Sequence, residues 1–241
     1  MAKKSCYHDF ADFYDCMDTH ADLVYKLIKK KIKKFNPNTK SILEMACGTG
    51  RVINKFSRYY NCWGFDASRQ MIEKAKEKKK RVNFFIADMR TFNIKQRFDV
   101  IFCVFDSINH LLYLNEWNKT FINSYKHLNK GGLFIFDVNT PNKLNNFYNY
   151  PVQLLKKNNE YCIIEIKSLG KNSAEWDITM FKKIKRKKYY ISKEKICERA
   201  FALSEIKNRL KSHFDILEII NSKNQPTKKD EKRIFFICKK K

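Results

Sequence analysis

Three carboxylates follow strand-like segments in the first part of the chain. Glu44 lies in SILEMACGTG, Asp66 ends CWGFD, and Asp88 ends the strand segment VNFFIAD. Since the carboxyl ends of parallel strands meet at one edge of a sheet, these groups are expected to face a common ligand. A carboxylate at the place of Asp66 binds ribose hydroxyls. One at the place of Asp88 can accept a hydrogen bond from the exocyclic amine of adenine, so the acids together predict an adenosine.

The turn after the first strand indicates what else this ligand carries. Gly48 and Gly50 allow a tight backbone turn and place amide groups at a helix N-terminus. No third glycine stands at the dinucleotide spacing and no Gly-Lys-Ser/Thr follows the turn, which argues against a dinucleotide or a nucleotide phosphate. The Glu44 carboxylate would repel a pyrophosphate but could receive an ammonium group. The predicted ligand is thus an adenosine with an amino-acid tail and no phosphate.

Alternating strand and helix patterns position these residues. Apolar residues recur at helical spacing from Asp18 to Phe35, with lysines around them, and predict an amphipathic helix. The strand-like segments SILEMA, CWGFD, VNFFIAD and FDVIFCVFD then alternate with helices predicted over 49–60, SRQMIEKAKEKKK and 115–128. A turn at Gly131 and Gly132 precedes a fifth strand, LFIFDVN. This order predicts a doubly wound α/β fold with a parallel sheet.

The pattern changes after Pro141. Aromatic and β-branched runs without helical spacing predict an inserted antiparallel sheet, after which a helix is expected to open at Ser204 as its N-cap. The segments FDILEII and KRIFFICKK lie a short loop apart and predict a terminal hairpin at one sheet edge. We therefore expect a cofactor-binding core with an N-terminal lid helix over 1–140, an inserted substrate-cover sheet over 141–200, and a return helix with hairpin over 201–241.

With these motifs in place, the sequence resembles the class I S-adenosylmethionine-dependent methyltransferases over most of its length. LEMACGTG is similar to their motif I, GFDAS to the ribose-binding acid, ADMR to the adenine-binding loop, and FDVIFCVFDSINHL to the fourth strand and its loop. GGLFIFDVNTPNKL and ERAFALSEI resemble small-molecule enzymes related to glycine/sarcosine and nucleotide-sugar N-methyltransferases. The resemblance implies a seven-stranded Rossmann-like sheet of order 3-2-1-4-5-7-6 with strand seven antiparallel.

The resemblance also implies which residues hold S-adenosyl-L-methionine and its product S-adenosyl-L-homocysteine. Glu44 and the two glycines would line the methionine end, Asp66 the ribose, and Asp88 with Met89 the adenine. Arg51 and Tyr14 could reach the methionine carboxylate, although Tyr14 is equally well explained as a packing residue of the lid helix. The full predicted set is Tyr14, Glu44, Ala46, Gly48, Gly50, Arg51, Asp66, Ala67, Met71, Asp88, Met89 and Phe105.

Methyl transfer from a sulfonium is an in-line displacement that depends mainly on alignment in a dry site. Asp106, just past the fourth strand, is expected beside the sulfonium and the acceptor. His110, four residues later, is the best-placed candidate for a base, needed only if the acceptor is protonated. A packed or hydrogen-bonded histidine at a helix start is the simpler explanation.

The acceptor site is less well defined by the sequence. Asp137 and Asn139 end the fifth strand and either hydrogen-bond a polar acceptor or cap the strand. Trp176, with other aromatic residues of the insertion, either walls an acceptor pocket or belongs to its core. Arg199 follows Glu198 in CERAF, and the pair either meets the substrate or each other. No metal ligands are predicted, because the eight cysteines are scattered without CxxC pairs or histidines at ligand spacing.

The formal charge of +25 raises the question of nucleic acid, because clustered cations gain affinity by releasing counterions from phosphates. Forty of the fifty basic residues are Lys, whereas base and phosphate recognition favours Arg. Nucleic acid is therefore not the favoured partner. No segment is apolar enough for a signal peptide or a membrane span, and the scattered cysteines suggest reduced thiols, so we expect a cytoplasmic monomer or homodimer.

The favoured function is methyl transfer to nitrogen or oxygen of a small-molecule acceptor. One alternative is an RNA methyltransferase that uses the basic surface; the loop after the fourth strand reads VFDSIN and lacks the Pro-Pro-aromatic grip on a flipped base amine. A second alternative is a non-catalytic docking subunit with the same fold. Fold alone does not decide between them.

Overall fold

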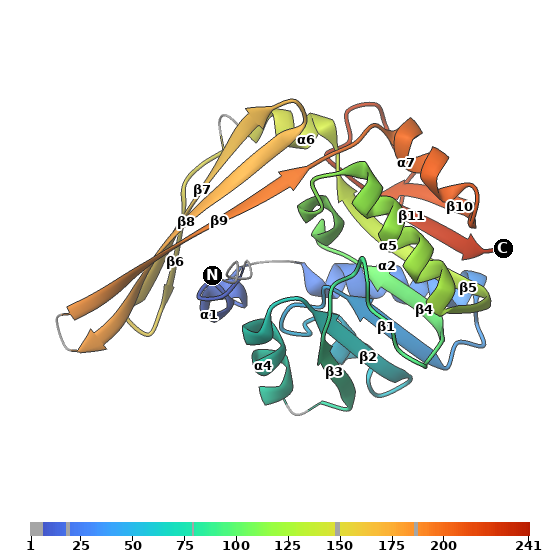
Figure 1. The fold of residues 1–241 in the computed structure, drawn as a ribbon, viewed down its shortest axis with the longest axis horizontal. Helices are drawn as coiled ribbons and strands as arrows, with labels where there is room; N and C mark the ends of the chain where they lie inside the picture. The colour runs from blue at the N-terminus through green and yellow to red at the C-terminus, as the bar shows by residue number, and fades with distance from the viewer. Residues whose placement is uncertain (1–6, 18–19, 79, 148–149, 186–187) are drawn as a thin grey trace.

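The structure is a computed structural model that describes residues 7–17, 20–78, 80–147, 150–185 and 188–241 (Figure 1). Its main sheet has seven strands in the order β3-β2-β1-β4-β5-β11-β10. The strands are β1 (Ser41–Met45), β2 (Asn61–Asp66), β3 (Val82–Ile86), β4 (Phe98–Cys103), β5 (Leu128–Asn139), β10 (Phe214–Asn221) and β11 (Arg233–Lys240). Strands β1 to β5 are parallel, and β11 runs antiparallel to both β5 and β10. The predicted order and the antiparallel last strand are confirmed.

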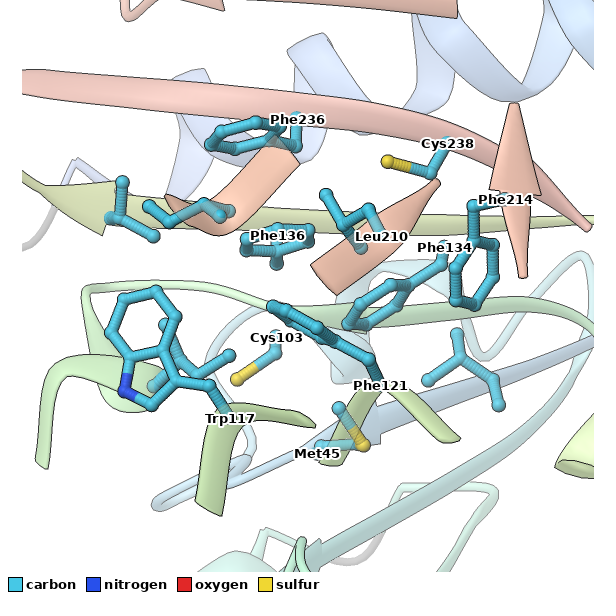
Figure 2. Packing of buried hydrophobic residues seen from close by; sticks show 14 of the residues in the cluster. Met45, Cys103, Trp117, Phe121, Phe134, Phe136, Leu210, Phe214, Phe236 and Cys238 are labelled. Atoms are coloured by element: carbon cyan, nitrogen blue, oxygen red, sulfur yellow. The ribbon is translucent and has the colours of Figure 1, made fainter. Parts of the chain in front are cut away.

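Helices cover both faces of this sheet. Trp117 and Phe121 of α5 (Leu114–His127) and Leu210 of α7 (Leu203–Leu210) pack on one face, where Figure 2 shows them around Phe136 and Phe236. On the other face lie α2 (Ala21–Phe35) and α3 (Ile53–Phe56), while α4 (Arg69–Glu77) packs on β2 and β3. The apolar stripes of the helices therefore enclose a sheet whose central strands are apolar on both sides, as parallel strands require.

Several element boundaries differ from the sequence prediction. The helix expected over 49–60 forms only at α3, because the glycine turn before it uses left-handed backbone at Gly48 and Gly50. The α7 helix begins at Leu203 rather than after Ser204, and Glu205 accepts the backbone N–H of Ala202, which is the N-cap. Gly131 and Gly132 lie in an irregular part of β5 and not in a turn before it. Asp18, the predicted start of the first helix, is outside the described residues.

A second, four-stranded antiparallel sheet follows β5 and the short helix α6 (Pro141–Asn145). It consists of β6 (Gln153–Lys157), β7 (Glu160–Gly170), β8 (Ser173–Lys185) and β9 (Lys188–Arg199). Figure 1 shows it projecting from the main sheet as an arm. The predicted antiparallel insertion is present, and the boundaries at 140 and 200 stay a prediction.

The N-terminal strap, residues 7–17 with helix α1 (Ala11–Tyr14), lies between the arm and the main sheet (Figure 1). Phe10 and Phe13 are buried in the apolar core of the arm. Asp12 forms ion pairs with Lys182 of β8 at 2.6 Å and with Lys74 of α4 at 2.6 Å. The strap therefore joins the two sheets across the carboxyl edge of the parallel strands. No helix in the described ranges is long and apolar enough to cross a membrane.

Candidate functional site

The loop after β1 is shaped by two glycines in left-handed backbone, Gly48 at φ +52° and Gly50 at φ +74°. A Cβ on Gly48 would lie 3.2 Å from the ring of Tyr14, and one on Gly50 would lie 2.8 Å from the ring of Phe84. The first glycine lets the N-terminal strap approach the loop, and the second lets the loop pack on β3. Any side chain at either position would strain the turn.

Asp66, at the end of β2, is fixed by the neighbouring loop. Its carboxylate accepts hydrogen bonds from the backbone N–H of Gly48 at 2.9 Å and of Ser68 at 2.8 Å. Burial raises the pKa of this carboxyl above its usual value, and the backbone hydrogen bonds oppose that shift. The group is thus oriented by two loops before any ligand arrives.

A cavity of about 660 Å³ opens at this edge of the sheet, and we call it the edge cavity. It brings together ten residues that the sequence analysis selected: Tyr14, Ala46, Gly48, Asp66, Ala67, Met71, Asp88, Met89, Phe105 and His110. They come from the strap, the ends of β1 to β4, and helix α4. Residues far apart in the chain therefore surround one space of ligand size.

Asp88 is held by a cation that the sequence analysis did not select. Nε of Arg90 donates to both carboxylate oxygens of Asp88, at 2.9 and 3.0 Å, and Nη1 of Arg90 binds Glu116. Burial opposes ionisation of Asp88, but the hydrogen bonds from Arg90 lower its pKa below the usual value. An amine that binds Asp88 would therefore share its oxygens with Arg90.

Three residues predicted to touch the ligand, Glu44, Gly50 and Arg51, do not line the edge cavity. Glu44 is 2% exposed, and its Oε2 accepts the backbone N–H of Ile53 at 2.9 Å, so the carboxylate supports the start of α3. Burial raises its pKa well above the usual value. Arg51 turns toward the strap, where Nη1 donates to the carbonyl of Met17 at 2.8 Å. Gly50 shapes the loop without lining the cavity.

A second cavity, of about 820 Å³, lies between the main sheet and the arm, and we call it the insertion cavity. Four residues line both cavities: Tyr7, Tyr14, Phe105 and His110. Leu155, Ile166 and Trp176 of the arm form part of its apolar wall, and charged groups form another part. The two cavities therefore meet at a small set of side chains from the strap and the loop after β4.

A network of three acids, two cations and an amide, which we call the ionic cluster, forms the charged wall of the insertion cavity and extends behind it. Its members are Asp106, Asp137, Asn139, Lys143, Glu198 and Arg233. Arg233 contacts Asp106 at 2.9 Å and Asp137 at 3.1 Å. Nδ2 of Asn139 donates to Glu198 at 2.7 Å and to Asp106, and its Oδ1 accepts from Lys143 at 2.9 Å. Every member is thus held by another.

The carboxyls of the ionic cluster differ in their protonation tendencies. Burial raises the pKa of Glu198 and of Asp137. Burial acts on Asp106 in the same direction, but the charges of Arg233 and Lys143 outweigh it and lower the pKa of Asp106. Asp106 is therefore a fixed anion and a weak base, whereas Glu198 is the carboxyl of the cavity wall more disposed to hold a proton.

His110 lies where the cavities meet. Its Nδ1 is 3.2 Å from the carbonyl oxygen of Cys197, and its Nε2 is 2.9 Å from the hydroxyl of Tyr7. Because a carbonyl can only accept, Nδ1 carries the hydrogen, and in the neutral ring Nε2 accepts the Tyr7 O–H. Phe105 and Asp106 both adopt left-handed backbone, φ +59° and +54°, which is strained for residues other than glycine. This bend turns Phe105 toward both cavities.

Of the four residues predicted to contact the acceptor, only Trp176 lines the insertion cavity. Trp176 lines the insertion cavity, and its buried Nε1 has no hydrogen-bond partner among the described residues. Asp137 and Asn139 lie behind the wall, where they hold Asp106 and do not line either cavity. Arg199 lines neither cavity; its guanidinium lies over the ring of Phe201 and donates to the carbonyl of Leu112.

Sequence reasoning did not select Tyr7, Arg90, Lys143 or Arg233. Arg233 had a usable signal, because the first residue of a last strand that runs antiparallel must lie at the carboxyl edge of the other strands. It pairs in register with Asn139, the last residue of β5. Lys143 follows β5 by one turn of α6 and also lies close to that edge.

Comparison with known proteins places the edge cavity in context. A family model described as a methyltransferase domain matches residues 42–132. A protein of Geobacillus sp. (strain WCH70), provisionally named a methyltransferase, is 26% identical over 97% of this chain and 99% of its own length. The crystal structure of an S-adenosylmethionine-dependent methyltransferase from Clostridium acetobutylicum ATCC 824 superposes with a TM-score of 0.84, at 26% identity, over 98% of this chain and 99% of that one.

A sugar-modifying enzyme is also similar. The dTDP-4-amino-2,3,4,6-tetradeoxy-D-glucose N,N-dimethyltransferase of Saccharopolyspora spinosa is 28% identical over 54% of this chain and 54% of its own. The chain thus spans about half the length of that relative. The segment matched by the family model contains the β1 loop, Asp66, Asp88 and His110, which line the edge cavity together with residues outside the match.

Proposed function

We propose that this chain, an S-adenosylmethionine-dependent methyltransferase, transfers the methyl group to a nitrogen or oxygen atom of a small molecule held in the insertion cavity. The observation that carries the proposal is the meeting of the two cavities at Tyr7, Tyr14, Phe105 and His110. A donor in one cavity and an acceptor in the other would face each other across these side chains. Such alignment is the main requirement of an in-line displacement.

The residues of the edge cavity fit the cofactor by their chemistry. Asp66 would bind the ribose hydroxyls and Asp88 with Met89 the adenine, while Gly48 lets the Tyr14 ring lie against the loop beside them. When bound, S-adenosylmethionine supplies an electrophilic methyl group. Tyr7 and Tyr14 of the strap would cover the methyl group and exclude water from it.

An amine is the acceptor group that we favour. The dimethyltransferase of Saccharopolyspora spinosa acts, by its name, on an amino sugar. Asp106 and Glu198 line the insertion cavity beside Lys143 and Arg233, so this wall offers carboxyl oxygens that could accept an N–H of an amine. The Trp176 N–H, which has no partner in the described chain, would donate to an oxygen of the same acceptor. A hydroxyl acceptor in the same position remains within the proposal.

Proton removal would follow from the arrangement at His110. An ammonium acceptor must lose a proton before its nitrogen can attack, and Nε2 of His110 is the ring nitrogen without a hydrogen. Asp106 is bound by Arg233 and Asn139, so we assign it an orienting role. We propose that His110 takes the proton after its hydrogen bond to Tyr7 opens.

Label transfer from S-adenosylmethionine tests the proposal. The protein is incubated with cofactor labelled on the methyl group and with cell extract separated into small molecules, RNA and protein. We expect label in the small-molecule fraction, reduced in the His110→Gln variant that still binds cofactor. Label that enters only RNA or protein would overturn the proposal, as would a folded enzyme that binds cofactor and labels no fraction.

A further inference from the structure

A basic groove runs along the opposite side of the β1 loop from the edge cavity. It consists of two adjoining hollows of about 670 and 610 Å³ between the start of α2, helix α3 and the connection from α4 to β3. The hollows share Asp22, Asn54, Lys55 and Lys80. Six cations line the groove: Arg51, Lys55, Arg58, Lys78, Lys80 and Arg81. Asp22 is the single carboxylate among its described lining residues.

Part of this positive charge is already neutralised and part is not. Lys55 pairs with Asp22 at 2.8 Å, and Lys78 pairs with Asp15 at 2.9 Å. Arg58, Lys80 and Arg81 are exposed, and their side chains form no hydrogen bond or ion pair with the described part of the chain. The groove therefore presents three uncompensated cations to solvent.

The Lys-rich composition of the chain does not explain this groove. Only ten of the fifty basic residues are Arg, yet three of these ten line this one groove. Arginine provides several donors in a planar group and binds phosphate through two parallel hydrogen bonds. Its concentration here points to an anion with oxygen pairs rather than to general surface charge.

Two further features match a base rather than another kind of anion. Tyr59 lines the groove with 63% of its surface exposed. The Lys29 ammonium lies over its ring, 5.1 Å from the centroid, so a base would stack on the ring face opposite Lys29. Asn54 lies between the two hollows, and its buried Oδ1 has no partner among the described residues. A nucleobase supplies both a face to stack on Tyr59 and an N–H to donate to Asn54. An acidic peptide could bind the cations and donate a backbone N–H to Asn54, but its carboxylate side chains have no face to stack on Tyr59.

We propose that the basic groove binds single-stranded nucleic acid. Phosphates would contact Arg58, Lys80 and Arg81, and a base would stack on Tyr59. An N–H group of a base would donate a hydrogen bond to Oδ1 of Asn54. The cations extend over both hollows, so several consecutive nucleotides fit better than one free nucleotide. Arg58, Tyr59, Lys80 and Arg81 line neither methyl-transfer cavity, although the first hollow shares His20 and Leu23 with the insertion cavity. The proposal does not depend on the proposed acceptor.

Fluorescence anisotropy with labelled single-stranded RNA and DNA of about 10 nucleotides tests the proposal. With three phosphates neutralised, affinity for a single strand should fall about 20-fold between about 50 and about 200 mM salt. The triple variant Arg58→Gln, Lys80→Gln and Arg81→Gln should bind at least about tenfold more weakly. Tyr59→Ala should lose about fivefold or more through lost stacking. Stronger binding of RNA than of DNA would identify RNA as the natural ligand.

A matched control separates the groove from the net charge. The triple variant Arg97→Gln, Lys207→Gln and Arg209→Gln removes the same charges from exposed positions outside the groove and should bind RNA as the unchanged protein does. All variants should bind S-adenosylmethionine normally, which shows that they are folded. Equal loss in both triple variants would overturn the proposal. Equally strong displacement of RNA by polyglutamate would also overturn it and indicate an acidic peptide ligand.

Discussion

Asp66 and Asp106 have different roles near the cavities because different groups bind their carboxylates. Asp66 accepts hydrogen bonds from backbone amides and lines the edge cavity, and burial raises its pKa. Asp106 is bound by Arg233 and Asn139, which keep it ionised in a buried place. The first carboxylate has remaining capacity to accept hydrogen bonds from a ligand, whereas the second is used to hold the wall together.

At Asp66, we predict that the Asp66→Asn variant binds S-adenosylmethionine about tenfold to 100-fold more weakly. A hydrogen bond to a charged group contributes about 1.5–3 kcal/mol, and the amide removes the charge while keeping the shape. Calorimetric titration with S-adenosylmethionine and S-adenosylhomocysteine measures the effect. Asp215→Asn, at an exposed position of β10, is the control and should bind normally. Unchanged affinity in the Asp66 variant would contradict its assignment to the ribose.

At Arg233, we predict that Arg233→Gln lowers the free energy of unfolding by about 3 kcal/mol near neutral pH. The change leaves Asp106 and Asp137 buried beside each other with less compensation. Urea unfolding measures the effect, and Arg209→Gln on the exposed face of α7 should change stability by less than about 0.5 kcal/mol.

The loss of stability caused by Arg233→Gln should become smaller as the pH falls. The lowered pKa of Asp106 contributes stability that is present above its unfolded value of about 3.9 and is lost as pH falls through the folded value. The variant lacks this contribution, so its deficit should be largest near neutral pH and shrink as pH falls below about 4. A deficit that grows with acidity would contradict the ionised state of Asp106.

At the scale of elements, the N-terminal strap connects parts of the chain that no local pattern relates. Glu194 of β9 accepts the backbone N–H groups of Asp9 and Phe10 at 2.5 and 3.1 Å, and Lys182 of β8 binds Asp9 and Asp12. On the other side, Lys78, the C-cap of α4, pairs with Asp15. Tyr7 and Tyr14 enter both cavities only while these contacts hold the strap in place.

We predict that Lys182→Gln increases hydrogen exchange in residues 7–17 while exchange in β1, β4 and β5 stays slow. The loss of two ion pairs to Asp9 and Asp12 weakens the strap without touching the main sheet. Cofactor affinity should fall about three- to tenfold, since partly exposed pairs contribute up to about 1 kcal/mol each. Lys195→Gln, which removes an ion pair to Glu175 on the arm, should leave exchange in the strap unchanged.

At the scale of the whole molecule, β11 connects the main apolar core with the ionic cluster. It inserts between β5 and β10, brings Arg233 to the ionic cluster, and places Phe236 on the ring of Phe136 (Figure 2). The two rings are parallel within 3° at a centroid distance of 4.8 Å, and both are fully buried. Folding of the last strand therefore completes the main core and the charged wall of the insertion cavity together.

We predict that Phe236→Ala lowers the free energy of unfolding by about 3–5 kcal/mol, the usual cost of removing a buried aromatic ring. Chemical denaturation measures this change. Tyr59→Ala removes an aromatic ring of similar size that is 63% exposed and should cost less than about 0.5 kcal/mol. Similar losses in both variants would show that burial of Phe236 does not stabilise the fold.

The sequence by itself determined the alternation of strands and helices, the terminal hairpin and most of the edge cavity, because these depend on local patterns. The strand order and the antiparallel last strand followed from the resemblance to class I methyltransferases. A strand end followed by a glycine turn or an acid has one place in such a sheet. Glu44 and Arg51 were predicted to line the edge cavity and do not. Their positions are local, but the directions of their side chains depend on Ile53 and Met17, which the pattern does not specify.

Only the tertiary structure decided which residues form the insertion cavity. Tyr7, Trp176 and Arg233 are more than fifty residues apart from one another and meet there because the arm and the strap fold back over the sheet. It also decided that Asp137 and Asn139 support Asp106 instead of lining the cavity. Buried charges must find partners wherever the fold supplies them, and those partners came from β9, β11 and α6, at distances along the chain that no periodic pattern records.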